Sequence, residues 1–304
     1  MAGLARIAVL ALTLTPVLFA SRLTLTSAQS TSDIDLLISR VGERVAEFYK
    51  RAQTVMCTEK STMQPISRDW SGDGMPRTVE SDLRIEMQGG DIDMPVEPTL
   101  VRDVRSVNGR PPNPRDAKSR FGCTDPNPLS PEPLAFLLPA HREDYRFTSI
   151  REANDHGRRA LVISFQTAIR KSHLELIQDE HGHDDCFDWK GQASRNGRVW
   201  VDPTTDDVLK VESWLAGPID IQVPEKLQRH YSFSPWIVLE RDDQTLRYKP
   251  VPFTDPDEAL LLPDSVESMT ILRSGLQSVR TRAVLTDYRR FLTSSRIKRG
   301  RGGW

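Results

Sequence analysis

Two hydrophobic periods divide the chain into a leading helix and a long series of strands. Between residues 32 and 54, apolar side chains recur every three or four positions, which is the pattern of an amphipathic helix with one buried face. These positions are Ile34, Leu37, Val41, Val45 and Phe48. After the helix the period shortens to two, as at residues 82–87, where apolar and polar residues alternate as in a half-buried strand.

The alternating pattern continues to the end of the chain. Further strands are predicted at residues 145–151, 159–167, 198–201, 208–214, 219–223, 245–251, 265–272 and 279–288, and a second short helix at residues 132–138. The turns between consecutive strands are short and polar, so there is no space for crossover helices and the pairing should be antiparallel. The pattern predicts a mainly β protein of the α+β class: a curved antiparallel sheet or half-open β barrel with the N-terminal amphipathic helix packed on it.

The first residues have the organisation of an export signal. Arg6 supplies the positive start, an apolar run covers residues 7–20, and Thr26-Ser27-Ala28 places cleavage before Gln29. The apolar run is shorter than the about 20 residues that a membrane-spanning helix needs. We therefore expect residues 1–28 to be a cleaved signal peptide, and the protein to be periplasmic or extracellular, with no transmembrane segment after cleavage.

Downstream of the signal peptide, no repeat or low-complexity linker forces a division. We expect a single antiparallel β domain over residues 29–292, with a long Pro-rich excursion at about residues 111–139. A basic C-terminal tail follows at residues 293–304. The formal net charge of the whole chain is −1, which gives no general electrostatic reason to expect nucleic acid as a partner.

The cysteines are Cys57, Cys123 and Cys186, and export would expose them to oxidising conditions. One disulfide with one thiol left over is the simplest arrangement, and the sequence leaves all three pairings open. Cys123 with Cys186 is the favoured pair, because both lie in polar, loop-like surroundings whereas Cys57 begins a predicted strand.

Several aromatic residues fall in or beside predicted strands and are candidates to line the concave face of the sheet. A strongly curved sheet can enclose an apolar ligand there if one helix does not fill the space. The candidate ligand-binding residues are Trp200, Trp214, Phe165, Tyr248 and Trp236. Plain core packing is the alternative explanation for each of these side chains.

One hairpin resembles a known family. Gly197-Arg198-Val199-Trp200-Val201-Asp202-Pro203-Thr204, followed by Val208-Leu209-Lys210-Val211-Glu212, is similar to the hairpin of LolA/LolB-like periplasmic lipoprotein-sorting proteins. The chain is also similar to uncharacterised exported bacterial proteins that share this plan. The resemblance implies a half-open antiparallel β barrel covered by helices, in a family whose members bind acyl chains and perform no chemistry.

A polar segment between two predicted strands contains the one cluster that suggests chemistry. His181, His183 and Asp185 alternate, so in an extended segment they would share a face and offer ligands for Zn²⁺ or Cu²⁺. No HExxH or CxxC spacing supports a metal, and a solvated loop is the alternative. GxSxG, P-loop and strand-linked GxGxxG patterns are also missing from the sequence, so we expect no enzyme activity and no cofactor.

Three functional hypotheses remain open at this point. The first is a non-enzymatic carrier that holds an apolar or lipid-like ligand in the concavity of its sheet. The second is a structural or protein-interaction module of the cell envelope, whose core is filled by its own side chains. The third is a metal-binding protein or hydrolase that uses the segment from His181 to Cys186. An unfilled cavity would favour the first hypothesis and a packed interior the second.

Overall fold

A computed structural model gives the structure of the chain, which is described over residues 31–52, 54–88, 97–112, 133–169, 171–178, 187–273 and 276–290. In this part of the chain, helix α1 (Thr31–Ala52) precedes a series of strands and short helices. The strands are β1 (Val55–Ile66), β2 (Arg77–Gln88), β3 (Glu97–Val107), β4 (Tyr145–Asp155), β5 (Arg158–Thr167), β6 (His173–Gln178), β7 (Phe187–Gln192), β8 (Arg195–Val201), β9 (Val208–Leu215), β10 (Ile219–Gln222), β11 (Trp236–Thr254), β12 (Asp257–Arg273) and β13 (Ser278–Arg290). The other helices are η2 (Ala135–Leu137), η3 (Pro139–Asp144) and α2 (Glu225–Tyr231).

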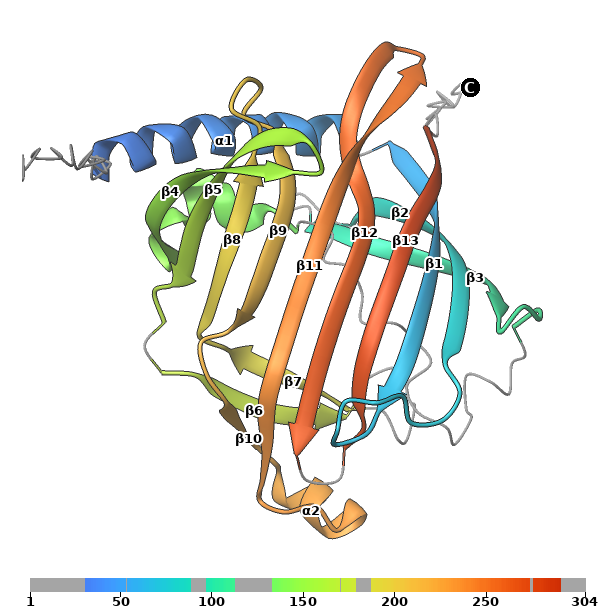
Figure 1. Ribbon diagram of the computed structural model, residues 1–304. Helices are drawn as coiled ribbons and strands as arrows, with labels where there is room; N and C mark the ends of the chain where they lie inside the picture. Colours follow the sequence, from blue (N-terminus) through green and yellow to red (C-terminus); the bar gives the residue numbers. More distant parts are fainter. Residues whose placement is uncertain are drawn as a thin grey trace, which may run out of the picture.

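These strands form one strongly curved sheet, in the order β3-β2-β1-β13-β12-β11-β9-β8-β5-β4 (Figure 1). Every neighbouring pair in that order is antiparallel. A ribbon of β10, β6 and β7 branches from β11 at the end of the sheet away from α1, and its β10–β6 contact is parallel. The predicted α+β class and half-open antiparallel barrel are confirmed.

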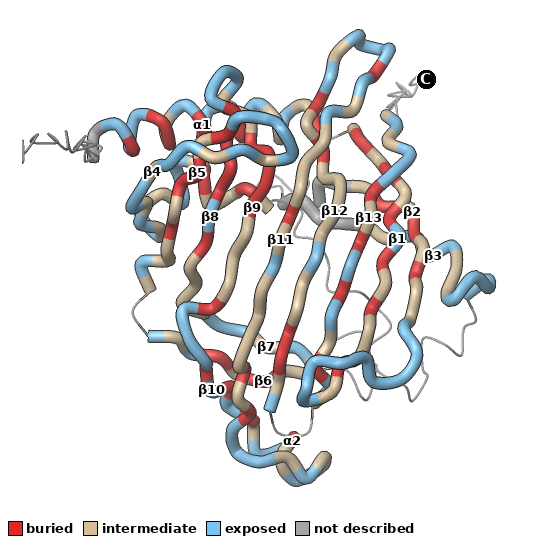
Figure 2. Tube along the Cα trace, viewed as in Figure 1, coloured by how far each residue is buried: buried red, intermediate tan, exposed pale blue. Residues whose placement is uncertain are grey.

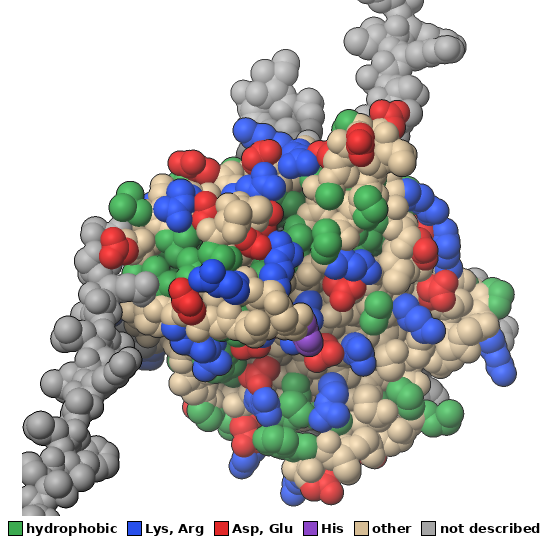
Figure 3. Space-filling model, turned by 45° about the horizontal axis from the view of Figure 1, so that its top comes forward, with side chains coloured by type: hydrophobic (Ala, Val, Ile, Leu, Met, Phe, Trp, Pro, Cys, Tyr) green, Lys and Arg blue, Asp and Glu red, His purple; other side chains and the backbone are tan. Residues whose placement is uncertain are grey.

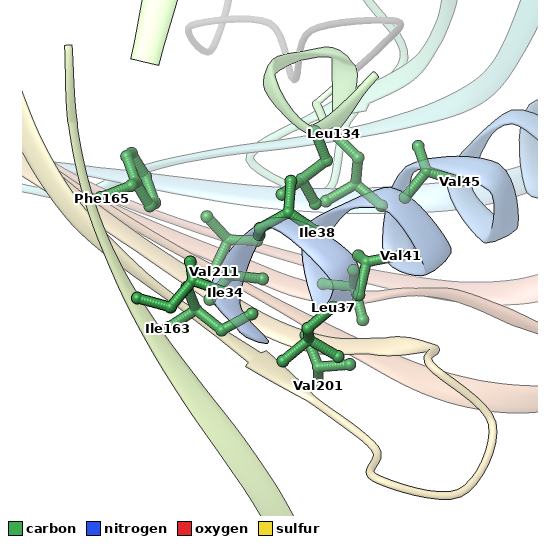
Figure 4. Packing of buried hydrophobic residues seen from close by; sticks show 13 residues of the cluster. Ile34, Leu37, Ile38, Val41, Val45, Leu134, Ile163, Phe165, Val201 and Val211 are labelled. Atoms are coloured by element: carbon green, nitrogen blue, oxygen red, sulfur yellow. The ribbon is translucent and has the colours of Figure 1, made fainter. Parts of the chain in front are cut away.

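Helix α1 lies across one end of the sheet because its apolar stripe needs a buried partner. Asp33 in its first turn and Lys50 and Arg51 in its last turn complement the helix dipole. The buried face of α1 packs on β5, β8, β9 and the segment around η2 (Figure 4). This α1 core contains Ile34, Leu37, Ile38, Val41, Val45, Leu134, Leu137, Ile163, Phe165, Val199, Val201, Val208 and Val211.

A second apolar core lies at the other end of the sheet. Residues of β6, β9, β10, α2 and β11 form this far-end core. Figure 2 shows buried positions along β6 and β10 at this end. Its members are Leu174, Leu176, Leu215, Ile219, Ile221, Val223, Leu227, Ile237 and Leu239. The two cores therefore lie at opposite ends of β9 and β11, and part of the concave face lies between them.

The predicted elements are present, with some differences in extent. Strands β11 and β12 are much longer than predicted, and β6 and β7 occupy part of a segment that the sequence suggested was polar loop. The short α-helix predicted at 132–138 is corrected to one 3-10 turn, η2. Pro139 disfavours helical backbone at Leu138, which is extended with φ −69° and ψ 148°.

The predicted signal peptide and basic tail lie outside the described residues. Among the helices that are described, none combines the length and apolar character needed to cross a membrane.

Candidate functional site

The five aromatic candidates do not share one face of the sheet. Val199 and Val201 of β8 point into the α1 core, so Trp200 between them points to the convex side and packs with Ala160, Val162 and Leu209. Lys210 on β9 lies over the Trp200 ring, with its Nζ 3.5 Å from the ring centroid. Trp200 is thus part of a small outer cluster capped by a cation.

Trp214 and Trp236 are also outside the concavity. Trp214 is paired across the β8–β9 ladder with Asn196, in the set of outward positions that includes Trp200 and Lys210. The Arg198 guanidinium lies 5.3 Å from the centroid of the Trp214 ring. Trp236 begins β11 opposite Gln222 and is 51% exposed.

Phe165 and Tyr248 do face the concavity and belong to the α1 core or pack against it. Phe165 lies over Gly197 of β8, where a Cβ atom would come within 2.2 Å of the Phe165 ring and 2.5 Å of the Glu212 carbonyl oxygen. Glycine at position 197 therefore makes room for the phenyl ring. The Tyr248 ring meets Phe48 of α1 edge to face, at a centroid distance of 6.3 Å.

A cavity opens beside Tyr248, where strands β9 and β11 stop pairing. The ladder between them runs only from Ser213–Gln244 to Lys210–Arg247. Beyond it lies a cavity of about 230 Å³, which we call the window. The apolar side chains of its wall are Val45, Phe48, Leu134, Val208, Tyr248, Pro250, Ala259, Leu260 and Leu261. The window joins the outer surface to the space beneath α1.

Tyr248 lines this wall, but its hydroxyl group is buried and has no partner in the described residues. Its oxygen is shielded from solvent and makes no hydrogen bond in the part of the chain that is described. Burial raises the pKa of the phenol well above its ordinary value, so the group stays a neutral donor at physiological pH.

Ion pairs surround the mouth of the window and fix the helix to the β8–β9 turn. Arg44 Nε lies 2.6 Å from Asp207 Oδ1, which raises the pKa of the arginine, and Arg40 Nε lies 3.0 Å from Asp206 Oδ2. Arg51 pairs with Glu258 on the opposite side. The surface view onto this end shows basic and acidic side chains interleaved around apolar ones (Figure 3).

Asp202 completes this arrangement at the start of the turn. Burial opposes its charge, but the backbone N–H groups of Thr204 and Thr205 and the Arg158 guanidinium hold the pKa of the carboxyl below its ordinary value. The acidic residues of the hairpin turn therefore organise the turn and anchor α1.

A second and larger cavity lies between the α1 core and the far-end core. It has a volume of about 360 Å³, and most of its wall is polar; we call it the polar cavity. Its lining residues are Glu59, Ser61, Asp188, Trp189, Arg195, Ser213, Asp242, Gln244, Val266, Ser268, Thr281 and Ala283. Neither the aromatic pattern nor the short motifs in the sequence pointed to it.

The predicted metal ligands and the predicted disulfide lie in parts of the chain that the structure does not describe. His181, His183, Asp185, Cys123 and Cys186 lie outside the described residues, so the metal site and the bridge remain predictions. The described residues contain no group of His, Cys, Asp and Glu side chains arranged to hold a metal ion. Cys57 is buried and reduced, and burial together with the Glu59 charge raises the pKa of its thiol to about 12.

No family model and no curated protein matches the chain. Among solved structures, a LolA superfamily protein from Nitrosomonas europaea is similar over 84% of this chain and 93% of that chain, with 11% identity and a TM-score of 0.33. A domain from Vibrio parahaemolyticus named for outer-membrane lipoprotein sorting matches over 82% and 92%, with 13% identity and a TM-score of 0.30. A DUF1329 family protein from Desulfovibrio piger matches over 86% and 95%, with 9% identity and a TM-score of 0.39. With TM-scores below 0.5 and identities of 9–13%, these likenesses assign neither a family nor a function to this chain.

Proposed function

We propose that this chain is an exported binding protein, without chemistry of its own, that takes an apolar or lipid-like ligand through the window between β9 and β11. The observation that carries the proposal is unfilled space of about 230 Å³ with an apolar wall beside the α1 core. A core that only needed to be stable would fill such space, because each unfilled methylene costs packing energy.

The mouth of the window suits an amphiphile rather than a pure hydrocarbon. Arg44, Arg51 and Arg158 border the cavity together with its apolar residues. Each guanidinium has five N–H donors and its carboxylate partner occupies only some of them, so donors remain for a polar headgroup. The apolar part of the ligand would then enter beside Phe48 and Tyr248, as clefts for small molecules generally combine an apolar wall with a few polar groups.

The direct test is native mass spectrometry of the protein purified from the periplasm of a producing cell, followed by denaturation to release bound molecules. We expect the mass of the chain without residues 1–28, with a fatty acid or phospholipid at near-unit occupancy. A mass that retains residues 1–28 would contradict export with cleavage. A clean apo mass would favour the structural or interaction module instead.

A pair of matched variants locates the site. Ala259 and Ala168 are both exposed, but only Ala259 lines the window. Ala168 follows the C-terminal end of β5, whereas the window is bordered by Arg158 at the start of that strand. We expect Ala259→Trp to weaken binding of a dansyl-labelled fatty acid at least about tenfold by closing the window, and Ala168→Trp to leave it unchanged. Equal effects of the two substitutions would place the ligand elsewhere.

A further inference from the structure

The polar cavity arises from a band of polar residues that crosses the concave face between the two apolar cores. On β11 the inward side chains run from Tyr248 and Leu246 through Gln244 and Asp242 to Leu239. The same change from apolar to polar and back occurs on β9 with Val211, Ser213 and Leu215. The register joins these polar positions across the sheet: Ser213 pairs with Gln244, Gln244 with Ser268, and Ser268 with Thr281.

The polar band is buried only in part: Gln244 is exposed and Ser268 is half-buried, whereas Ser61 and Thr281 are buried. Burying a hydroxyl group without a partner costs free energy, so a sheet selected for stability alone would carry apolar side chains at the buried positions. Ser61 lines the cavity on β1 with 0% exposure, and its hydroxyl has no hydrogen-bond partner in the part of the chain that is described. Departures of this kind from the packing rules mark functional positions.

Three of the four charged side chains that line the cavity are held in ion pairs. The fourth, Asp188, is exposed, and its Oδ1 accepts a hydrogen bond from the backbone N–H of Trp189 at 2.8 Å. Arg195 Nη1 lies 2.6 Å from Asp242 Oδ2, and Thr270 donates to the other oxygen of Asp242 at 3.0 Å. Glu59 is 3% exposed and receives two hydrogen bonds from Arg102, at 2.5 and 3.0 Å. An ionic ligand would have to compete with these pairs, which are strong where solvent is restricted.

The hydrogen-bonding capacity that remains is neutral, apart from the exposed Asp188. In the described chain, no hydrogen bond joins the side chains of Gln244, Ser268 or Thr281 to a protein group, and all three line the cavity. Together these three side chains offer both donors and acceptors. Trp189 of β7 adds an apolar ring at the edge of the cavity.

We propose that the polar cavity is a second binding site, separate from the window, and that its ligand is a neutral polyhydroxylated molecule of the size of a mono- or disaccharide. A ligand whose polar groups are all hydroxyls can donate hydrogen bonds to, and accept them from, serine, threonine and glutamine side chains. It would leave the Arg195–Asp242 and Arg102–Glu59 pairs intact. The indole of Trp189 packs against the apolar face of the ring. The volume of about 360 Å³ lies in the range of small-molecule sites.

The test is saturation-transfer NMR with the mature protein and a mixture of neutral sugars, among them glucose, xylose and trehalose, beside glucuronate and glucosamine as charged counterparts. We expect transfer to at least one neutral sugar, which binds at least about tenfold more tightly than its charged counterpart, since each factor of ten needs only about 1.4 kcal/mol. Absence of transfer to every neutral sugar would mean that the cavity holds water alone, and that result would overturn the proposal. Preferred binding of glucuronate or glucosamine would overturn it as well.

Matched variants separate binding from folding. Ser268 faces the cavity, whereas Ser265, three positions earlier on β12, pairs with Arg247 on the outer side. We expect Ser268→Val to reduce sugar affinity at least about tenfold and Ser265→Val to leave it unchanged, with both variants folded by circular dichroism. If Ser268→Val does not fold, Thr281→Val serves as the second inner variant. Equal affinities for inner and outer variants would contradict the site, whatever happens to the fatty-acid probe at the window.

Discussion

The α1 core and the polar band occupy neighbouring stretches of β8 and β9 but differ in what their side chains contribute. In the α1 core, side chains such as Val41, Ile163 and Val201 are fully buried and contribute by removal of apolar surface from water. In the polar band, Asp242, Arg195 and Thr270 satisfy one another and leave further hydroxyl groups unused. The first region holds the helix on the sheet, and the second leaves room and hydrogen-bonding capacity.

The comparison shows that curvature alone does not define an apolar binding face. The inward positions of one strand change character within a few residues, as on β12, where Leu262 is buried among apolar residues and Ser268 lines the polar cavity. Stability is therefore concentrated at the two ends of the sheet, and ligand chemistry is expected to differ between the window and the polar cavity.

A charge placed in the α1 core should be the most damaging change. Val41 has 0% exposure, whereas Leu36 on the opposite face of α1 is 63% exposed. Val41→Asp buries an unpaired carboxylate among apolar groups, so we expect a loss of more than about 4 kcal/mol in the free energy of unfolding. Leu36→Asp should change it by less than about 0.5 kcal/mol. Urea unfolding followed by circular dichroism measures both, and similar losses would show that α1 is not held by its apolar face.

The ion pair beside the polar cavity provides the next largest effect. Arg102→Met leaves the buried Glu59 carboxylate without its partner, at an expected cost of about 3–5 kcal/mol. The double variant Glu59→Gln with Arg102→Met removes both charges and should recover most of this loss, because much of the cost is an uncompensated charge rather than a lost attraction. Failure of the double variant to recover stability would mean that the pair itself supports the fold.

The sequence predicted the parts of the fold that depend on one repeated period. The three- and four-residue spacing from Ile34 to Phe48 placed α1 within two residues at its C-terminal end, and alternation placed β5 and β13 closely. It failed for β6 and β7, which are short and polar on one face. Their burial depends on α2 and β10, which come from later in the chain.

The candidate sites were harder to predict because they depend on register and face. Alternation shows that Trp200 and Val199 point opposite ways, but only the position of α1 shows which of them is inside. Aromatic type was therefore a poor guide to the concave face, where Phe165 and Tyr248 lie and Trp200 does not. The residues of the polar band occupy inward positions of β9, β11, β12 and β13. That they form one band follows only from the register, which aligns these positions across the sheet.

The close contact at the border of the α1 core should give an intermediate effect. A methyl group at position 197 would overlap the Phe165 ring and the Glu212 carbonyl, whereas nothing lies within 4 Å of a Cβ atom at Gly217. We expect Gly197→Ala to cost about 1–3 kcal/mol through overpacking, and Gly217→Ala to be nearly neutral. Phe165→Leu in the Gly197→Ala background should recover part of the loss. Thermal unfolding of the four proteins tests this, and a neutral Gly197→Ala would show that β8 and β5 adjust without strain.

The last comparison concerns two hydroxyl groups of the polar band, and the substitution of Ser61 should have the smallest effect of all. The Thr270 hydroxyl donates to Asp242 at 3.0 Å, whereas the buried Ser61 hydroxyl has no partner in the described residues. Thr270→Val should therefore cost about 1–3 kcal/mol, because it leaves an acceptor of a charged group less satisfied. Ser61→Ala should change stability by less than about 0.5 kcal/mol or raise it slightly, since it removes a buried group that makes no bond. Urea unfolding of the unliganded protein measures both substitutions. A loss above about 1 kcal/mol for Ser61→Ala would mean that its buried hydroxyl makes a hydrogen bond in the folded chain.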